Sequence, residues 1–443
     1  PEHPKHRHED LAQSIIRVVP VHKDLAMASR VSAVLLCFGA FTLWGTGVRC
    51  LDNGLALTPP MGWLTWSRFM CNECALGRSE NCLTSELILQ MADKMVEDGY
   101  LEAGYEYVMI DDCWSHTNRD LEGRLFADPR RFPEGMKKLV DKVHEKGLKF
   151  GIYADIGSKT CGGYPGSYGH YATDAQTFAD WGVDYVKVDG CNAKASDMDT
   201  LYPEMGQALR ETGRDMVYSC EWPLYQIVAG ILPNYKNISK NCNLWRNYFD
   251  INYTWDQISS IVNFEASVQD PVTAVTGPGA WNDPDMLVIG NYGLTIEQQR
   301  AHLAYWAIMA APLIMSNDLR NIPAESKELL LNKYIIAVDQ DPLGLMGRRI
   351  YKAKNLDVWA RWVTPQLSNG KKSLAVLVHS TKVLGGPVAA SISLLSLGLD
   401  SPAGYVLTDL IRNNTVIGKV YPGDSINATV DPLDVCFFKA TVL

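Results

Sequence analysis

The feature that most constrains the fold of this chain is a two-part unit that recurs from Leu51 to about Arg349. Each unit opens with a short run of β-branched or aromatic residues that ends in polar residues, and a longer stretch with helical periodicity follows it. The eight runs are Met61–Trp66, Tyr105–Asp112, Lys149–Asp155, Asp184–Asp189, Met216–Trp222, Leu244–Asp250, Ala280–Asp285 and Leu313–Asp318. Strands that alternate with helices pair in parallel, and eight of them predict a closed (β/α)8 barrel, the TIM-barrel type of α/β fold.

Helix-like stretches lie between these runs, among them Thr84–Asp98, Gly135–Lys146, Thr173–Trp181 and Thr295–Ala310. Glycine follows three of them at the positions where a helix is expected to stop, namely Gly99, Gly147 and Gly182. We therefore expect residues 51–349 to form one catalytic barrel.

The pattern changes after Pro342-Leu343-Gly344. Short alternating runs without a long helical stretch follow: Val358–Val363, Ser373–His379, Ala389–Leu394, Gly404–Asp409, Asn427–Val430 and Val435–Ala440. Such runs are typical of an antiparallel β-sandwich, which we place at residues 350–443. This segment contains no evident cluster of catalytic residue types.

The first 50 residues are interpreted as an upstream extension and a signal peptide. Residues 1–26 are polar and rich in histidine, whereas Met27 precedes a mostly apolar run, Val31–Trp44, that is shorter than a membrane span of about 20 residues. We place the signal peptide at about 27–50 and the start of the mature protein at Leu51. Residues 1–26 fit an over-extended gene model, with a genuine anchor or extension as the alternative. No later stretch resembles a transmembrane helix, so we expect no stable membrane insertion.

Charge and cysteine content restrict the partners and the compartment. With 41 basic and 50 acidic residues the chain has a net charge of −9 and no basic field for nucleic acid or anionic lipid.

Of its eleven cysteines, Cys37 and Cys50 leave with the signal peptide, so eight of the other nine could pair. Sequons agree with passage through an oxidising, glycosylating lumen; they lie at Asn237, Asn252, Asn413 and Asn427. A zinc site at Cys71-x-x-Cys74 is the alternative, but no second such pair or histidine cluster follows it.

Aspartate marks the carboxyl ends of six predicted strands: Asp111 with Asp112, Asp155, Asp189, Asp250, Asp285 and Asp318. Active sites of (β/α)8 barrels lie on the face to which these ends belong. An aspartate after a strand can also be the N-cap of the following helix, and for any single residue the two interpretations are equally good. For the whole set, a pocket lined with carboxylates is the simpler explanation.

Two carboxylates that flank one bond are sufficient for cleaving a glycosidic linkage. Lys187 and Asp189 lie two residues apart on one strand and hence on one face, so a nearby ammonium could keep Asp189 ionised and nucleophilic, with a buried salt bridge as the alternative. A second, protonated aspartate would be the acid, and periodicity alone does not choose between Asp250, near Arg246, and Asp285. We expect no metal and no cofactor, because only His116 lies beside a strand end and the two cations would compete with a metal ion.

Tryptophan near the first strand could stack on the apolar face of a sugar. Trp63 is equally well explained as part of the barrel core, whereas Trp66 is the better candidate for the sugar.

Seven ordered motifs carry a resemblance to a known family: Leu-Asp-Asn-Gly-Leu-Ala (51–56), Pro-Pro-Met-Gly-Trp (59–63), Ile-Asp-Asp-Cys-Trp (110–114), Gly-Ile-Tyr-Ala-Asp (151–155), Lys-Val-Asp-Gly-Cys (187–191), Ser-Cys-Glu-Trp-Pro-Leu-Tyr (219–225) and Trp-Asn-Asp-Pro-Asp-Met (281–286). Through them the chain resembles animal lysosomal α-galactosidases of glycoside hydrolase family 27. The resemblance extends from Leu51 through Gly347 and thins in the predicted sandwich.

The resemblance implies a retaining double displacement at the anomeric carbon of a terminal α-galactoside, with Asp189 as nucleophile and Asp250 as acid/base. It also implies that other matched residues bind the sugar. These are Asp111 and Asp112 for the 6- and 4-hydroxyls, Lys187 for the 3- and 4-hydroxyls, Arg246, Glu221 and Asp285 on the far side of the ring, Trp66, Tyr153 and Met286 as apolar walls, and Leu224 and Tyr225 beside them.

One short segment separates α-galactosidases from their sister enzymes, the α-N-acetylgalactosaminidases. In the sister enzymes, the positions that match Glu221 and Leu224 are Ser and Ala, which are small enough to admit a 2-acetamido group. The bulkier pair in this chain favours galactose, because Glu221 can bond the 2-hydroxyl and Leu224 fills the space that an acetyl group would need. The alternatives are an α-N-acetylgalactosaminidase, a catalytically inactive galactose-binding relative and a secreted scaffold whose sandwich binds partners. Weak sister activity is also compatible with an α-galactosidase.

The family pairing implies four disulfides, Cys71–Cys113, Cys74–Cys82, Cys161–Cys191 and Cys220–Cys242, with Cys436 left as a buried free thiol. A glycan at Asn252, two residues past Asp250, would crowd the mouth of the site, so we predict that this sequon is the one left unoccupied. The resemblance further implies a homodimer and residence in the lysosome, reached by the secretory pathway. The predicted partners are terminal α-galactosides of glycolipids, glycoproteins or oligosaccharides.

Overall fold

A computed structural model of the chain describes residues 51–72 and 80–443. The predicted extension and signal peptide, and Cys74 with its predicted partnership, lie outside the described residues. None of the helices in the described part is both long enough and apolar enough to cross a membrane.

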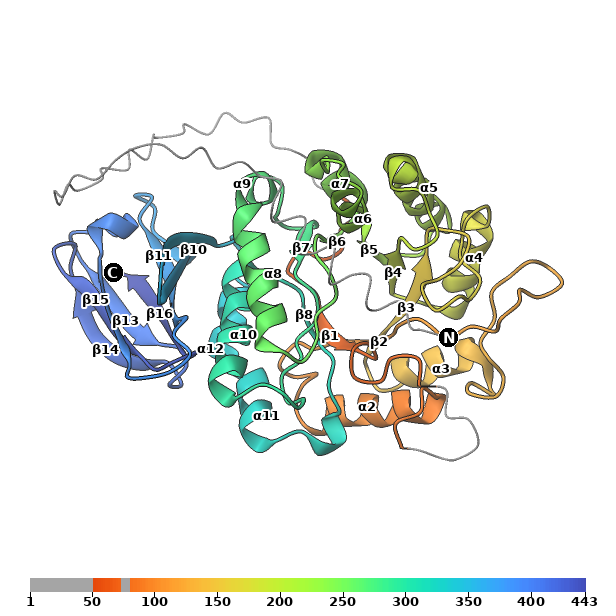
Figure 1. The fold of residues 1–443 in the computed structure, drawn as a ribbon, viewed down its shortest axis with the longest axis horizontal. Coiled ribbons are helices and arrows are strands. Elements are labelled where there is room, and N and C mark those ends of the chain that lie inside the picture. The colour runs from red at the N-terminus through yellow and green to blue at the C-terminus, as the bar shows by residue number, and fades with distance from the viewer. Residues whose placement is uncertain (1–50, 73–79) are drawn as a thin grey trace. The chain divides into compact units, whose positions relative to one another are not determined.

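Eight parallel strands form the first sheet, in the order β7-β6-β5-β4-β3-β2-β1-β8 (Figure 1). Their bounds are β1 Met61–Leu64, β2 Tyr107–Ile110, β3 Lys149–Asp155, β4 Tyr185–Asp189, β5 Val217–Cys220, β6 Leu244–Arg246, β7 Trp281–Asp283 and β8 Leu313–Met315. A parallel bridge between Leu287 and Met315 joins the segment after β7 to β8 and closes the barrel. The predicted (β/α)8 barrel is therefore confirmed.

Helices follow the strands and cover the barrel. They are α2 Ser85–Glu97, α3 Gly135–His144, α4 Tyr171–Trp181, α5 Met198–Glu211, α6 Trp222–Val228, α7 Tyr235–Asn241, α8 Trp255–Ser267, α9 Gln269–Thr273, α10 Ile296–Met309, α11 Ala324–Leu330 and α12 Lys333–Asp339. Local signals set their ends: the Thr84 hydroxyl accepts the Leu87 N–H at the start of α2, and Gly182 ends α4 at a left-handed φ of 83°.

Most predicted strands extend too far at their carboxyl ends. The run Leu244–Asp250, for example, is a strand only over Leu244–Arg246. Beyond this point the backbone leaves the sheet, so that the polar residues can turn toward the barrel axis rather than continue the strand. The residues that were predicted to end strands are thus the ones that build the rim.

The C-terminal region contains two antiparallel sheets, as the fold prediction requires. Six strands are ordered β14-β13-β16-β11-β10-β9, and β12 pairs with β15. Their bounds are β9 Arg348–Ala353, β10 Leu356–Gln366, β11 Lys372–Ser380, β12 Val388–Ser393, β13 Tyr405–Asp409, β14 Thr415–Val420, β15 Ser425–Val430 and β16 Val435–Val442. Both sheets contribute to one apolar core, with Val376 and Phe438 from the larger sheet and Ile426 from the smaller.

Strands β9 and β14 were not predicted from the sequence. Both have mostly exposed or half-buried side chains and lie at the two edges of the six-stranded sheet, so they lack the alternation that marked the inner strands. Because β9 starts at Arg348, the predicted boundary between residues 349 and 350 falls inside this strand. That boundary stays a prediction.

Candidate active site

The carboxyl ends of the barrel strands bring the predicted acidic residues to one rim. Asp189 is the last residue of β4, Asp111 and Asp112 follow β2, Glu221 follows β5 and Asp285 follows β7. All five side chains are buried. Asp318 differs, because it accepts the Arg320 N–H as the N-cap of the short helix Leu319–Asn321 and pairs with the Arg320 guanidinium at 2.8 Å. For this one aspartate the capping interpretation is correct.

Asp189 is held by two tyrosine hydroxyls and one backbone amide. Tyr153 donates to its Oδ2 at 2.9 Å, Tyr225 donates to its Oδ1 at 2.5 Å, and the Gly190 N–H donates to Oδ1 at 2.7 Å. The Cys161 sulfur lies 3.1 Å from Oδ2. Three donors fix the orientation of the carboxylate and stabilise its charge, which is what an attacking group requires.

Lys187 does not form an ion pair with Asp189. Its ammonium lies 2.8 Å from Asp111 and 3.4 Å from Glu221, so the predicted same-face cation belongs to a buried salt-bridge group that joins β4 to the residues after β2 and β5. Burial lowers the pKa of Lys187, but the two carboxylates more than offset this and hold the pKa well above its usual value. Lys187 therefore stays charged, and it holds Asp111 and Glu221 in place.

Arg246, the last residue of β6, lies among three carboxylates. Its guanidinium is 3.3 Å from Glu221, 3.0 Å from Asp250 and 3.2 Å from Asp285. Glu221 and Asp285 are buried, whereas 58% of the Asp250 side chain is exposed. Asp250 is thus the carboxylate of this group that can exchange protons with solvent, which suits an acid/base.

Asp285 adopts a backbone conformation that is rare for residues other than glycine, with a φ of 79°. Its surroundings hold it there. Its carboxylate accepts the Ile251 N–H at 2.7 Å, its own N–H donates to Asp283 at 2.8 Å, and its carbonyl accepts the Trp306 indole N–H at 2.6 Å. Because Ile251 follows Asp250, the carboxylate of Asp285 also fixes the backbone beside Asp250. Strain that is held by several bonds is typical of functional sites.

Burial changes the protonation of several acids in this region. It raises the pKa of Asp112 and of Asp283 to about 6 each, although backbone N–H donors at Asp112 and the Arg246 cation at Asp283 act in the opposite direction. Both groups are therefore largely protonated at acidic pH. In that range the neutral Asp112 and Asp283 add no negative charge, so the repulsion among the acids of the site is weaker.

Apolar side chains complete the pocket. Tyr153, Met286 and Leu224 are buried at the rim, Trp66 is partly exposed, and Trp63 is fully buried with its indole N–H bonded to the Asn317 carbonyl at 2.9 Å. Trp63 is thus a core residue. A narrow pocket extends from this rim into the barrel, and Lys187, Arg246, Asp285 and Met286 contribute to its wall.

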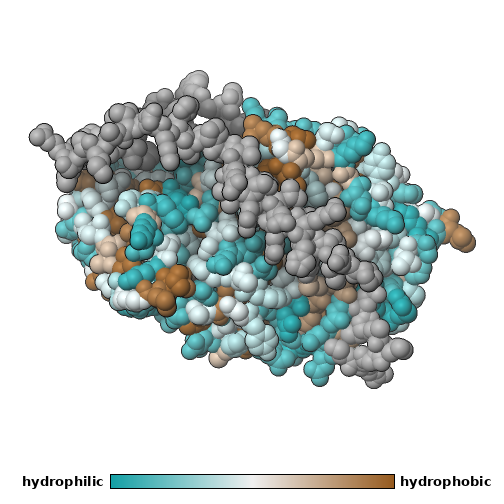
Figure 2. Space-filling view, in the orientation of Figure 1, coloured by the Kyte–Doolittle hydropathy of each residue, from teal (hydrophilic) through white to brown (hydrophobic). Residues whose placement is uncertain are grey.

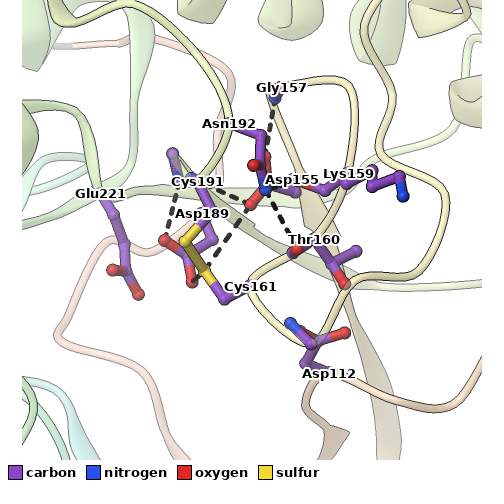
Figure 3. Close-up of a disulfide and its surroundings, with 12 residues drawn as sticks. Asp112, Asp155, Gly157, Lys159, Thr160, Cys161, Asp189, Cys191, Asn192 and Glu221 are labelled. Carbon is purple, nitrogen blue, oxygen red and sulfur yellow. Dashed lines mark hydrogen bonds between the residues drawn. A yellow bond between two sulfur atoms is a disulfide. The ribbon is translucent and has the colours of Figure 1, made fainter. Parts of the chain in front are cut away.

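The two cysteines beside Asp189 form a disulfide. Figure 3 shows this Cys161–Cys191 bond next to Asp189 and Asp155. These four side chains place their possible ligand atoms within 4.8 Å of one another, but sulfurs that are bonded to each other cannot act as thiolate ligands. The group therefore does not fit a metal site.

Three of the four predicted disulfides are present among the described residues: Cys71–Cys113, Cys161–Cys191 and Cys220–Cys242. Cys436 has a free thiol and is half-buried. The sequon asparagines differ in environment. Asn237 is half-buried in α7, whereas Asn252, Asn413 and Asn427 are exposed.

Two buried acids at the rim received no individual role from the sequence: Asp155 was predicted only as one of the aspartates that line the pocket, and Asp283 was not chosen. Asp155 is the last residue of β3 and Asp283 the last residue of β7. A signal was present for both. Asp155 ends one of the matched motifs, and Asp283 lies two residues before Asp285, at the spacing that places strand residues on one face.

Comparison with known proteins agrees with this geometry. The family described as "Alpha galactosidase A" matches residues 58–341. The chain belongs to this family. It is therefore a glycoside hydrolase, and the predicted enzyme class is confirmed.

Relatives named as α-galactosidases and relatives named as α-N-acetylgalactosaminidases have comparable sequence identity to this chain. Human "Alpha-galactosidase A" is 50% identical over 368 residues, which cover 83% of this chain and 84% of the relative. The "Alpha-N-acetylgalactosaminidase" of Gallus gallus is 46% identical over 389 residues, 87% of this chain and 94% of the relative. Among solved structures, alpha-galactosidase I from Mortierella vinacea has a TM-score of 0.76 at 30% identity and covers 88% of this chain and 98% of its own. Overall identity therefore does not separate the two sugar specificities.

Proposed function

We propose that this chain is a retaining exo-α-galactosidase that releases terminal α-D-galactosyl residues from glycolipids, glycoproteins and oligosaccharides. The observation that carries the proposal is the pair Glu221 and Leu224 at the start of α6. Glu221 is buried and held by Arg246 and Lys187, at 3.3 and 3.4 Å, so its carboxylate is fixed rather than mobile. Leu224 is buried beside it. In this proposal the fixed carboxylate accepts a bond from the 2-hydroxyl, and the buried leucine occupies the space that a 2-acetamido group would need.

The reaction has two steps in this proposal. An Asp189 carboxylate oxygen attacks the anomeric carbon, the bond from that carbon to the leaving oxygen breaks, and Asp250 gives its proton to the leaving oxygen. Asp250 then takes a proton from water, and the water oxygen displaces Asp189, which restores the original configuration. The three donors on Asp189 support its role as nucleophile, and the exposure of Asp250 supports its role in proton exchange.

The remaining polar residues would bind hydroxyl groups. Asp111, Asp112, Lys187, Arg246 and Asp285 are each fixed by partners before substrate arrives. A sugar epimer that failed to reach them would leave buried polar groups unpaired, which costs affinity. Tyr153, Met286 and Trp66 would supply the apolar walls.

The test compares two substrates at about pH 4.5, in the acidic range proposed for a lysosomal hydrolase. Release of 4-nitrophenol from the α-galactoside and from the α-N-acetylgalactosaminide is measured on the secreted protein and on Asp189→Asn. We expect a large preference for the galactoside and a loss of at least about 1000-fold in the variant. A preference for the acetamido sugar would refute the proposed specificity, and no turnover of either by folded protein would favour the inactive sugar-binding alternative.

The double variant Glu221→Ser with Leu224→Ala sharpens this test. It should gain about 10- to 100-fold in the ratio of acetamido-sugar to galactoside turnover, because it opens the space beside the 2-position. Leu232→Ala, an exposed change outside the site, is the control and should leave the ratio unchanged. An unchanged ratio in the double variant would show that other residues set the specificity.

We also propose that two copies of the chain form a homodimer. The support is exposed apolar surface on a monomer of a secreted protein: 67% of Val383 and 81% of Leu384 are exposed on the loop between β11 and β12, and Figure 2 shows that hydrophobic residues gather in patches on an otherwise hydrophilic face. Light scattering of the wild type and of Val383→Asp with Leu384→Asp tests this. A dimer that becomes a monomer is expected, and a wild-type monomer would refute the proposal.

Residence in the lysosome, reached by the secretory pathway, is the last part of the proposal. The disulfides and the exposed sequon asparagines support passage through an oxidising, glycosylating lumen. Fractionation of cells that express the tagged chain tests it. Enrichment with lysosomal markers is expected, and exclusive recovery from the medium would contradict it.

A further inference from the structure

Asp155 lies at the carboxyl end of β3, is fully buried, and has no role in the proposed reaction. It is the last residue of β3 and pairs in register with Asp189, the last residue of the neighbouring strand β4. Among the described residues no basic side chain forms an ion pair with it. A buried carboxylate that no cation compensates is costly, so such a group calls for a physical explanation.

The hydrogen bonds of Asp155 connect the two loops that flank Asp189. Its Oδ1 accepts the Gly157 N–H at 2.7 Å, from the loop after β3, and its Oδ2 accepts the Cys191 N–H at 3.0 Å, from the loop after β4. Figure 3 shows Asp155 between Gly157 and the Cys161–Cys191 disulfide. One carboxylate thus holds both segments that the disulfide also joins.

Additional contacts tighten the same junction. The Asn192 side-chain amide donates to the carbonyls of Lys159 and Thr160, at 3.0 and 3.2 Å. A Cβ atom on Gly157 would lie only 2.0 Å from the Cys191 carbonyl oxygen, so the loops approach as closely as glycine allows. The sulfur of Cys161, which lies 3.1 Å from the Asp189 carboxylate, is therefore carried by a segment with little freedom.

We infer that Asp155 is a positioning residue for the nucleophile: by bonding Gly157 and Cys191 it fixes the two loops and their disulfide around Asp189, so that the attacking oxygen is aimed at the anomeric carbon. This rests on the proposed role of Asp189. We assign Asp155 no contact with substrate, because it is fully buried and both of its carboxylate oxygens accept backbone N–H groups. Burial and the neighbouring Asp189 raise the pKa of Asp155 well above its usual range.

Asp155→Asn tests the inference, because an amide of the same shape can accept only one of the two N–H bonds and turns an N–H group toward the other. A fluorinated α-galactosyl reagent that traps the covalent intermediate measures the attack by Asp189, and the inhibition constant of galactose measures binding. We expect the trapping rate and kcat to fall by about 10- to 100-fold, with the inhibition constant within about 3-fold of wild type. A variant that is trapped at the wild-type rate, or that loses binding in proportion to the rate, would overturn the inference.

Two further variants keep the test decisive. Asp318→Asn makes the same chemical change at an aspartate that caps a short helix after β8 and pairs with Arg320, and it should trap at the wild-type rate. If Asp155→Asn does not fold, Asn192→Gly decides. It removes the bonds to Lys159 and Thr160 but tolerates the φ of 54° at this position. Slower trapping with unchanged galactose binding supports the inference, and wild-type trapping overturns it.

These outcomes are separate from a failure of the proposed function. If the wild type does not cleave α-galactosides at all, the proposed function is wrong, and there is no wild-type trapping rate with which to compare the variant. If the wild type cleaves them and Asp155→Asn does so equally well, only the positioning role is wrong.

Discussion

The rim of the barrel and the interior of the sandwich bury different kinds of side chain. The rim buries Asp111, Glu221, Arg246 and Asp285, and Asp285 has a strained backbone as well. The sandwich core is a cluster of aliphatic and aromatic residues in regular strands, such as Val376 and Phe438. The rim thus gives up stability to keep charged groups in fixed positions, whereas the sandwich core contributes stability by apolar burial. Sites where local folding rules are broken at a cost are the sites to examine for function.

The largest expected effect concerns activity at the rim. Asp250→Asn should lower turnover of galactosides with poor leaving groups by about 10²- to 10⁴-fold, because such groups need a proton as they depart. The loss in the first step should be smaller for 4-nitrophenyl galactoside, and azide should restore turnover because it attacks without a base. Steady-state kinetics with both substrates, with and without azide, measures this.

The melting temperature provides the control for Asp250→Asn. The side chain is 58% exposed, so thermal stability should stay close to that of the wild type. If neither the dependence on leaving group nor the azide rescue is observed, Asp250 is not the acid/base, and Asp285 becomes the candidate.

The second prediction concerns stability in the sandwich. Phe438→Ala removes a buried ring from the apolar core and should lower the free energy of unfolding by about 3–5 kcal/mol, because it leaves a cavity. Urea unfolding measures the loss. Activity per folded molecule should not change, and a changed kcat would mean that the sandwich core takes part in building the site, which would break the comparison.

The third prediction concerns pH. Burial of Glu265 in α8 raises its pKa to about 8, although Asn282 donates a bond to it at 2.9 Å. Because the pKa is higher in the folded state than in the unfolded state, Glu265 contributes its full stability below the unfolded value near 4.5, and this contribution is lost as the pH rises toward 8. Glu265→Gln, which stays neutral, should escape this loss.

Urea unfolding at about pH 5 and about pH 8 checks this. The free energy of unfolding of Glu265→Gln relative to wild type should rise between the two pH values by an amount on the order of a few kcal/mol. A constant difference would show that Glu265 does not change its charge over this range. The conservative change keeps the shape of the buried group, so packing contributes equally at both values.

The smallest expected effect concerns glycans. Asn252 lies two residues past Asp250, and its side-chain oxygen accepts the Thr254 N–H at 2.9 Å and the Thr254 hydroxyl at 2.6 Å. We predict that this sequon is unoccupied, so that Asn252→Gln has the kcat of the wild type and differs from it in mass only by the added methylene group. Glycopeptide mass spectrometry of the secreted protein provides the measurement. Full occupancy at Asn252 would contradict the prediction and show that the rim tolerates a glycan.

The sequence by itself determined the parts that depend on local pattern. Hydrophobic periodicity located all eight barrel strands and six of the eight strands of the sandwich, because buried strands and amphipathic helices each have a characteristic spacing of hydrophobic residues in the sequence. The edge strands β9 and β14 lacked that period and were missed. The aspartates at the strand ends marked the rim before any contact was known.

Only the tertiary structure decided which of these aspartates meet which partners. Closure of the barrel places Lys187 against Asp111 and Glu221 rather than Asp189. Asp318 instead caps a short helix and does not join the aspartates that line the site. Burial of Asp155 between two loops likewise depends on the register of β3 against β4. The physical reason is the distance along the chain over which each feature is determined. A period of two or 3.6 residues arises within one strand or helix, whereas the distance between side chains on different strands is set by the closed sheet as a whole.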